Sequence, residues 1–281
     1  MPNSIYRLLA IMGACLVLTG YAHAESTLEK VRASGSIKVG FANEAPYSYF
    51  TTTGQLTGES PEVFKRVMKR LGVGEVEGVL TEWGALIPGL KAGRFDAIVA
   101  SMYITPKRCR QIGFSNPTYG IDEAFIVSKG NPEGVSTYGE AAAKGAKVAF
   151  VAGTAEMQHA KLAGLSRTQW VVVPDFASAV AAVKSGRATA AALTSLTAKD
   201  LASKDQAIER AQPFTFTHKG KNYRSEGAFG FRKEDKALRD AVNRELANFI
   251  GSKEHQALVA PFGFDASNLP KKTAAQLCAG E

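Results

Sequence analysis

The sequence lacks several features that define common functional classes. It has three cysteines and four histidines among its 281 residues, and their spacing matches no structural zinc site. Beyond the extreme N-terminus it has no long apolar run, which excludes a polytopic membrane protein. Its 34 lysines and arginines exceed the 26 acidic residues and give a net charge of +8, but they are scattered and accompany no nucleic-acid-binding motif. We therefore expect no metal, no cofactor and no nucleic-acid partner.

The overall composition is that of an ordinary globular protein. Hydrophobic residues make up 45% of the chain and charged residues 21%, which excludes a wholly disordered or fibrous chain. At about 100–200 residues per domain, the length fits one large domain or two modest ones.

Residues 1–24 have the pattern of a signal peptide. Arg7 supplies a positive charge, a short apolar stretch follows, and residues 22–24 form an A-x-A cleavage site. We expect a mature chain that begins near residue 25 and is exported to the bacterial periplasm. A membrane anchor is disfavoured because the apolar stretch is short. Lipoprotein processing at Cys15 is disfavoured because the apolar stretch continues beyond that cysteine.

Removal of this segment leaves two cysteines, Cys109 and Cys278. An even number of cysteines in an oxidising compartment favours pairing. We predict a disulfide between them, which would attach the C-terminal tail to the first half of the chain.

Strand and helix patterns alternate along the mature chain. The first part predicts strands at 36–41, 76–80, 97–100 and 123–127 and helices at 60–71 and 83–92. The second part predicts strands at 147–151, 170–173 and 190–193 and helices at 155–163, 176–185 and 197–203. A last strand at 227–231 and an amphipathic helix at 238–250 follow. Alternating strands and helices are typical of an α/β fold with parallel, helix-covered sheets.

The pattern is interrupted at residues 129–132 and 219–222, on either side of the second unit. The last strand and helix have no unit of their own, so we expect them to rejoin the first. This gives a discontinuous lobe 1 (25–128 plus 225–281) and a lobe 2 (129–224). Ligands of open α/β sheets bind at the carboxyl ends of strands, and clefts between domains are favoured sites. We therefore expect function between the lobes.

Several short motifs occur together in the first half of the chain. A strand leads into NEAPY at 43–47, IPGLKAGRFDA spans 87–97, and TPKR and FSNP follow at 105–108 and 114–117. As a set they resemble family 3 periplasmic solute-binding proteins of ABC transporters, the polar amino-acid class. The resemblance covers residues 25–265.

The resemblance implies a fold and a set of partners. The fold is the type II periplasmic-binding-protein fold, with two Rossmann-like lobes on a two-strand hinge. The partners are a small-molecule ligand and an ABC permease in the inner membrane, and the protein is expected to be a monomer without catalytic residues. Arg108-Cys109, the run YGIDEAF at 119–125 and the Leu277-Cys278 tail are most similar to ectoine/hydroxyectoine-binding proteins.

In lobe 1 the resemblance implies an anchor and an aromatic box. Arg108 corresponds to the arginine that grips a ligand carboxylate, for which a planar guanidinium is suited. Taken alone, Arg108 would fit an exposed basic cluster. Tyr47, Trp83 and Tyr103 fall on positions that face the cleft, and three aromatic faces can surround a delocalised cation. Without the resemblance, aromatic residues fit core packing. Glu44 lies three residues before Tyr47 and could pair with the cation.

In lobe 2 the sequence departs from the usual amino-acid pattern. Thr154 and Glu156 lie in a loop that leads into a predicted helix N-terminus, which favours an anion, but Ala155 replaces a threonine of the family. Thr194 stands where an aspartate commonly clamps an α-ammonium group. This loss disfavours an ordinary α-amino acid and favours ectoine, a cyclic zwitterion with a delocalised amidinium.

Other functions remain open on the sequence. The ligand could be an ordinary or basic amino acid, an opine or a betaine-like cation. The same fold also resembles dehydratases of cyclic acids and lytic glycosidases, although a glycosidase needs paired carboxylates. A sensory module is a third class, and nothing in the sequence encodes a signalling domain.

Overall fold

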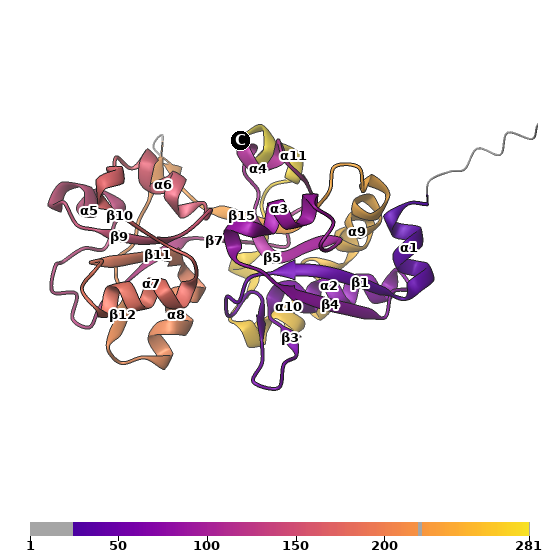
Figure 1. The fold of residues 1–281 in the computed structure, drawn as a ribbon, viewed down its shortest axis with the longest axis horizontal. Coiled ribbons are helices and arrows are strands. Elements are labelled where there is room, and N and C mark those ends of the chain that lie inside the picture. The colour runs from indigo at the N-terminus through magenta and orange to yellow at the C-terminus, as the bar shows by residue number, and fades with distance from the viewer. Residues whose placement is uncertain (1–24, 219–220, 281) are drawn as a thin grey trace, which may run out of the picture.

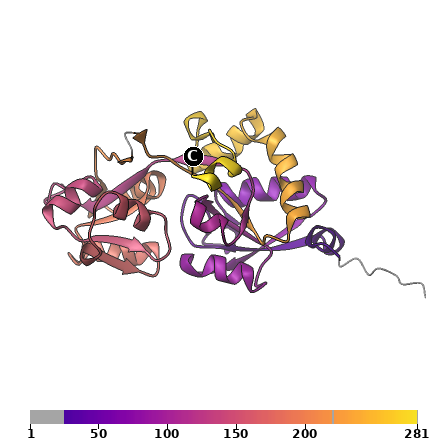
Figure 2. The same cartoon turned by 90° about the horizontal axis from the view of Figure 1, so that it is seen from above.

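Two β-sheets organise the residues that the computed structural model describes, 25–218 and 221–280. Each sheet with its helices forms one lobe, and Figures 1 and 2 show the lobes side by side. The predicted α/β class and two-lobed organisation are confirmed. Within the described residues no helix has both the length and the apolar character that a membrane crossing requires. The expected signal peptide, 1–24, lies outside the described residues.

The sheet of lobe 1 mixes parallel and antiparallel pairs. Its strand order is β4 (Glu75–Leu80), β1 (Ser36–Phe41), β5 (Ala97–Tyr103), β15 (Ser225–Phe231) and β6 (Gly113–Phe114), with β7 (Tyr119–Ile121) also paired to β15. β1 runs parallel to β4 and β5, whereas β15 runs antiparallel to β5. A short hairpin, β2 (Tyr49–Phe50) with β3 (Leu56–Thr57), lies outside this sheet.

Amphipathic helices cover the sheet of lobe 1. They are α1 (Thr27–Ser34), α2 (Glu59–Arg70), α3 (Leu86–Lys91), α9 (Lys236–Phe249) and α10 (Lys253–Val259). Helix α2 illustrates the sequence rule, because Val63, Phe64, Val67 and Met68 recur at helical spacing and are all fully buried. Helix α2 packs against β5, α9 and α10, while α3 contacts β1 and β5.

The sheet of lobe 2 has the order β10 (Trp170–Val173), β9 (Val148–Val151), β11 (Ala190–Thr194), β8 (Glu123–Ser128) and β12 (Ile208–Arg210). Four helices flank it, as Figure 1 shows: α5 (Tyr138–Lys144) and α6 (Glu156–Leu162) on one side, α7 (Phe176–Lys184) and α8 (Ser195–Lys204) on the other. Strand β8 contributes to both faces. Phe125 and Val127 pack in the core that includes Tyr138 of α5, while Ala124 and Ile126 belong to the core that includes α7.

One strand lies in a different sheet from the one we expected. The strand predicted at 123–127 was placed in lobe 1, but β8 pairs antiparallel with β11 and β12 in the sheet of lobe 2. The chain therefore crosses between lobes at Asp122, and residues 129–132 lie between β8 and α5 within lobe 2. A continuous apolar run identifies a buried strand but not its partners, which here lie at residues 190–194 and 208–210, far along the chain.

The chain returns to lobe 1 at residues 223–224. A small hairpin, β13 (Thr217–His218) with β14 (Lys221–Asn222), precedes this return, and β15 then pairs with β5 and β7. The two crossover segments lie next to each other, because Ser225 of β15 pairs with Ile121 of β7. This pairing produces a two-stranded connection between the lobes.

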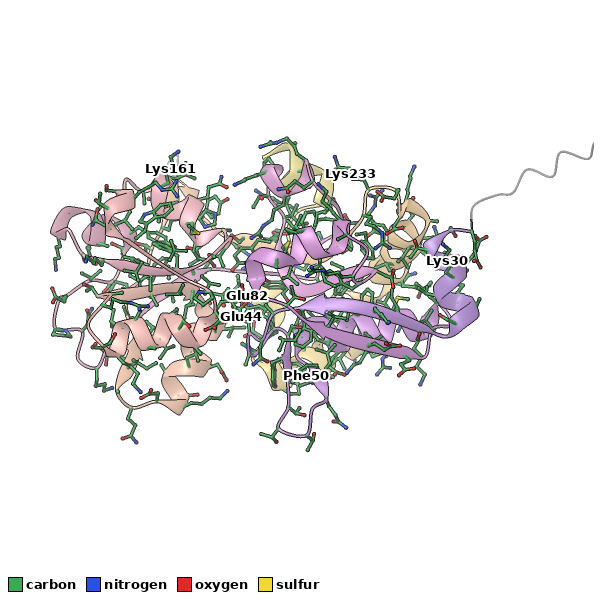
Figure 3. All side chains as sticks on the ribbon, in the orientation of Figure 1. Lys30, Glu44, Phe50, Glu82, Lys161 and Lys233 are labelled. Carbon is green, nitrogen blue, oxygen red and sulfur yellow. A yellow bond between two sulfur atoms is a disulfide. The ribbon has the colours of Figure 1, made fainter. Side chains whose placement is uncertain are left out.

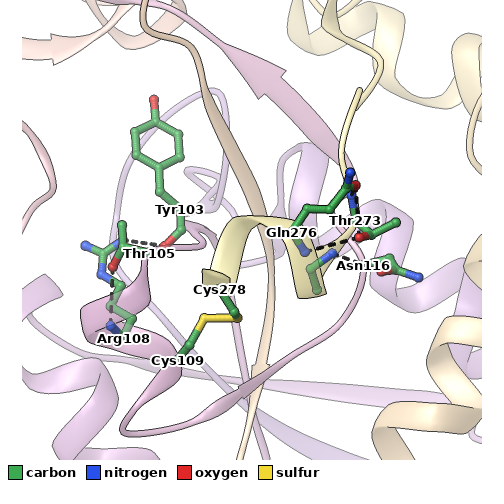
Figure 4. Close-up of a disulfide and its surroundings, with 9 residues drawn as sticks. Tyr103, Thr105, Arg108, Cys109, Asn116, Thr273, Gln276 and Cys278 are labelled. Carbon is green, nitrogen blue, oxygen red and sulfur yellow. Dashed lines mark hydrogen bonds between the residues drawn. A yellow bond between two sulfur atoms is a disulfide. The ribbon is translucent and has the colours of Figure 1, made fainter. Parts of the chain in front are cut away.

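The predicted disulfide is confirmed. Cys109 ends the short helix α4 (Pro106–Cys109) and Cys278 lies in α11 (Ala274–Ala279), with their Cα atoms 5.7 Å apart. Figure 4 shows this link beside Arg108. The C-terminal helix is therefore attached covalently to lobe 1.

Candidate ligand-binding site

A small cavity lies between the lobes. It is lined by Glu44, Tyr47, Trp83, Ser101, Tyr103, Tyr119, Thr154, Ala155, Glu156, Phe176 and Thr194. Most of these residues lie at or just beyond the carboxyl ends of strands, where the loops of an open α/β sheet carry ligand groups. Figure 3 shows Glu44 where the lobes meet. The structure thus brings together seven of the eight residues selected from the sequence.

The eighth residue, Arg108, lies beside the cavity rather than in its lining. Its side chain is 7% exposed, so the exposed basic cluster considered for it does not describe its position. Nη1 donates to the Tyr103 carbonyl at 2.8 Å and Nη2 to the Gly153 carbonyl at 3.0 Å. Its Cζ lies 5.6 Å from the Trp83 ring centroid. Trp83 therefore faces a cation that belongs to the protein itself.

Arg108 has no carboxylate partner within salt-bridge distance among the described residues. Its two carbonyl bonds use two of the five N–H donors of a guanidinium. Burial lowers its pKa, although a guanidinium stays protonated in proteins. A buried, unpaired charge is costly unless a counter-charge arrives. The site is therefore suited to an anionic group.

Two hydrogen-bond systems join the lobes around the cavity. The Gly153 carbonyl of lobe 2 accepts from Arg108 and, at 3.3 Å, from Nε1 of Trp83. On the other side, the Thr197 hydroxyl of lobe 2 donates to Glu44 of lobe 1 at 2.8 Å. The Thr194 hydroxyl donates to Thr197 at 2.9 Å, which makes Thr194 a support for that link.

Glu44 is a buried carboxyl group between the lobes. Burial raises its pKa to about 8, the Thr197 hydrogen bond opposes the rise, and the charge of Glu156 adds to it. The group is therefore poised to release a proton when a cation enters. No basic side chain lies within salt-bridge distance of Glu44 among the residues described.

Glu156 lies at the first position of α6, and a buried cluster stands behind it. Burial, with a contribution from Glu123, raises its pKa to about 7, while His159 and Arg108 oppose the rise. Glu123 contacts Nδ1 of His159 and accepts from the Tyr138 hydroxyl at 2.6 Å. Burial alone would lower the pKa of His159, but Glu123 overrides it and the pKa is raised.

The start of α6, where the sequence favours an anion, carries two side chains with oxygen acceptors. Glu156 is the first residue of the helix, and the Thr154 hydroxyl donates back to the Val151 carbonyl at 2.9 Å. The Thr154 hydroxyl is thus bonded to a local partner, and Glu156 lines the cavity as a hydrogen-bond acceptor. An acceptor is suited to a ligand cation rather than an anion.

Aromatic rings form one wall of the cavity. The ring centroids of Tyr47 and Tyr119 lie 5.3 Å apart, those of Tyr103 and Tyr119 lie 6.3 Å apart, and Trp83 meets Phe176 edge-on at 6.3 Å. The hydroxyls of Tyr47 and Tyr103 are both buried; that of Tyr103 has no hydrogen-bond partner among the described residues, and that of Tyr47 lies near Thr194. Burial raises the pKa of these tyrosines well above 10, so they stay neutral and can donate to a ligand.

A further buried carboxyl group, that of Glu59, supports this wall from within lobe 1. Glu59 accepts from the Ser101 hydroxyl at 2.8 Å and from the Thr118 hydroxyl at 2.9 Å. Ser101 has a φ of 51°, a conformation that costs energy in a non-glycine residue. The Ser101 carbonyl accepts from the Tyr119 hydroxyl at 2.8 Å. The strained strand residue Ser101 is thus held by hydrogen bonds through both its hydroxyl and its carbonyl group.

The sequence analysis did not select Ser101, Tyr119, Ala155 or Phe176. Phe176 lies three residues beyond the end of the strand at 170–173 and opens a helix, so its position near a strand end was visible in the sequence. Tyr119 lies in the run used for the family resemblance but was not assigned a role. No sequence pattern identified Ser101 as a site residue, because its conformation depends on a bulge in the pairing of β5 with β15. Across 25–218 and 221–280, no cluster of metal-ligating side chains occurs.

The fold and the cavity define a class of protein: two α/β lobes on a two-stranded connection, with a cavity between them. The chain belongs to family 3 of the bacterial extracellular solute-binding proteins, whose profile matches residues 37–265. It is the solute-binding subunit of an amino-acid-type ABC importer, and an ABC permease is the partner that this family implies.

Three similar proteins illustrate the family. A probable amino-acid ABC transporter periplasmic-binding protein of Sinorhizobium fredii, y4tE, is 37% identical over 94% of this chain and 89% of its own length. The crystal structure of EhuB in complex with hydroxyectoine aligns with a TM-score of 0.82 and 35% identity, over 91% of this chain and 98% of that one. An ancestral amino acid-binding protein, AncCDT-1, described as a precursor of cyclohexadienyl dehydratase, aligns with a TM-score of 0.72 and 29% identity, over 84% and 99%.

Proposed function

We propose that the protein captures ectoine or hydroxyectoine in the periplasm and delivers it, as a monomer, to its ABC permease. The observation that carries this proposal is the charge pattern of the cavity. Among residues 25–218 and 221–280, the buried cation Arg108 has no carboxylate partner, and the buried acids Glu44 and Glu156 have no basic partner at salt-bridge distance. A compact zwitterion supplies an anion to Arg108 and a cation to the buried acids.

The anionic half of the ligand would bind beside Arg108. Its guanidinium offers N–H groups beyond the two that bind the Tyr103 and Gly153 carbonyls. A bidentate pair with a carboxylate fixes orientation as well as charge. The unpaired Tyr103 hydroxyl is a further donor of this wall.

The cationic half would bind near Glu44 and the tyrosine rings. A delocalised amidinium spreads its charge over a flat surface, which suits aromatic faces and a buried carboxylate. Thr194 lines the cavity and its hydroxyl is already used in the bond to Thr197. The position that would hold an α-ammonium group in an amino-acid binder therefore offers no charge here.

A second candidate ligand is a basic amino acid or an opine. Glu156 favours it, because a second buried acid in the cavity could pair with an additional cationic group. The relative from Sinorhizobium fredii carries a general amino-acid designation. Thr194 disfavours this candidate, because it leaves the α-ammonium group without a carboxylate.

Calorimetry on ligand-stripped protein distinguishes these ligands. We expect heat with ectoine and hydroxyectoine, and little with arginine, octopine, glutamine or glycine betaine. Binding of arginine or octopine without ectoine binding would refute the ligand assignment and leave the family assignment intact. Recovery of unchanged ligand after prolonged incubation tests for capture, whereas a dehydrated or cleaved product would indicate an enzyme.

Arg108→Ala tests the anchor, with Arg110→Ala as the matched control. Arg110 lies two residues away on the same turn and is exposed. We expect Arg108→Ala to abolish binding at millimolar ligand while the circular dichroism spectrum is kept. Arg110→Ala should bind like the wild type. Equal affinities for the two variants would remove Arg108 from the site.

Export is tested separately, by N-terminal sequencing of the periplasmic protein, which we expect to begin near residue 25. Gel filtration with light scattering tests the oligomeric state, and we expect the mass of a monomer.

A further inference from the structure

The C-terminal residues 266–280, here called the C-terminal strap, lie across lobe 1 where both crossover strands and Arg108 are anchored. We propose that the C-terminal strap is a positioning element: it fixes Arg108 for the ligand and keeps the lobe 1 ends of the crossover strands rigid during closure. The part that concerns ligand affinity rests on the function proposed above. The strap comprises η4 (Ala266–Asn268), a connecting stretch and α11.

The first part of the strap holds the two crossover strands. Nδ2 of Asn268 donates to the Gly120 carbonyl of β7 at 3.3 Å. Nη2 of Arg224, in the returning crossover segment, donates to the Leu269 carbonyl at 3.1 Å. The Arg224 guanidinium also lies against Gly120, where a side chain on that glycine would collide with it. One short stretch of the strap therefore touches both connections between the lobes.

The middle of the strap is bound by a buried carboxylate, Glu226. This residue is the second of β15 and is 3% exposed. Its Oε1 accepts from the Lys271 backbone N–H at 2.9 Å and its Oε2 from the Lys272 backbone N–H at 3.2 Å. The Glu226 carbonyl accepts from the Ile104 N–H at 2.9 Å. Glu226 thus ties the strap to the strand end that leads into α4.

The last part of the strap supports α4 itself, as Figure 4 shows. The Ala274 N–H donates to Oδ1 of Asn116 at 3.2 Å, Leu277 is buried, and Cys278 forms the disulfide with Cys109. Cys109 is the residue after Arg108. The covalent link therefore acts on the same helical turn that aims the guanidinium.

Physical reasons make such support necessary. Helix α4 has four residues, and a single helical turn has little stability of its own because nucleation is unfavourable. Affinity depends on how well the binding group is preorganised. The disulfide and the strap restrict α4 before the ligand arrives. Hinge motion is absorbed by a few residues, and the bonds to Gly120 and Arg224 confine it to the segments beyond them.

The experiment compares three variants of the full-length mature protein. Glu226→Gln replaces one acceptor oxygen by an amide N–H that faces a backbone N–H, and it keeps the disulfide. Cys109→Ser with Cys278→Ser removes the covalent link. Glu254→Gln is the matched control, because Glu254 of α10 also accepts two donors in lobe 1, from Arg66 and Arg70, away from the strap. All are measured well below their melting temperatures.

Two readouts are used: hydrogen exchange of the α4 and β7 amides without ligand, and hydroxyectoine association and dissociation rates. For Glu226→Gln and the double serine variant we expect exchange to be at least about tenfold faster in α4. We expect dissociation about five- to tenfold faster with little change in association, since a less preorganised anchor holds the ligand less long. Glu254→Gln should change neither quantity.

Each other outcome overturns a stated part of the proposal. Unchanged exchange in α4 and β7 would show that the strap does not hold them. Faster exchange with unchanged dissociation would show that Arg108 needs no such positioning. If the wild-type protein binds neither ectoine nor hydroxyectoine, the proposed function fails, and exchange alone decides whether the strap restrains α4 and the crossover strands.

Discussion

The ionisation of Glu44 leads to a prediction about pH. The Glu44 pKa is raised to about 8 because the group is buried between the lobes. A ligand cation beside it requires the ionised form, so binding must release a proton below that pKa. At pH 6 roughly one molecule in a hundred carries the ionised group, whereas at pH 8 about half do. We therefore expect affinity to rise by about 50-fold from pH 6 to pH 8, or roughly 2 kcal/mol.

Glu156 adds to this effect if the cation also approaches it. Its pKa is raised to about 7, so its ionised fraction rises by about tenfold over the same interval. Ionisation of either carboxyl group tightens binding as pH rises, and the affinity should reach a plateau above about pH 9. Arg108 does not titrate in this range, so the contact between Arg108 and the ligand carboxylate adds nothing to the pH dependence of the affinity.

The assay is calorimetry of hydroxyectoine binding at pH 6, 7, 8 and 9, in phosphate and in Tris. These buffers differ in ionisation enthalpy, so a released proton makes the observed heat depend on the buffer. Glu44→Gln should bind weakly with a shallower pH dependence. Thr197→Val removes the hydrogen bond that lowers the pKa of Glu44, so its profile should move to higher pH.

The reasoning would be refuted by an affinity that varies less than about threefold between pH 6 and pH 8 together with heats that do not depend on the buffer. Either the ligand cation would then lie away from Glu44, or the carboxyl group would bind it as a neutral acceptor.

Three further predictions concern stability and specificity. The Glu59 pKa is raised to about 7 from 4.5, so the folded state keeps a proton that the unfolded chain loses; stability without ligand should fall by up to roughly 3 kcal/mol from pH 4.5 to pH 7. In urea unfolding, the stability of Glu59→Gln relative to the wild type should therefore increase as pH rises. If the two proteins differ in free energy of unfolding by the same amount at pH 4.5 and pH 8, this prediction is contradicted. Thr194→Asp keeps an N-cap for α8 but adds a carboxylate, so calorimetry should show weaker ectoine binding and new binding of arginine or glutamine; an unchanged ligand preference would exclude Thr194 as the discriminating position. Cys109→Ser with Cys278→Ser opens a link between residues 169 positions apart and should cost about 2–5 kcal/mol in urea unfolding, whereas equal midpoints would mean that the link adds no stability.

The sequence by itself determined the local structure. The strand at 36–41 was predicted with the bounds that β1 has, and the helix predicted at 60–71 differs from α2 by one residue at each end. Both follow from periodicity and capping, which depend on residues a few positions apart. The pairing of Cys109 with Cys278 was predictable because these are the two cysteines of the sequence after the expected signal peptide. Residues after strand ends were predictable as site candidates, because strand ends meet along one edge of a sheet.

Only the tertiary structure decided which sheet takes β8, because antiparallel pairing with β11 joins segments about 70 residues apart. It also decided that Tyr119 and Phe176 line the same cavity, since they come from different lobes. The raised pKa of Glu44 also depends on the contact between the lobes. Burial raises this pKa and has the larger effect, while the hydrogen bond from Thr197 of lobe 2, 153 residues away in the chain, opposes it. Burial and long-range pairing arise when segments far apart in the sequence pack together and exclude water. A local pattern of residues cannot predict which distant segments will do so.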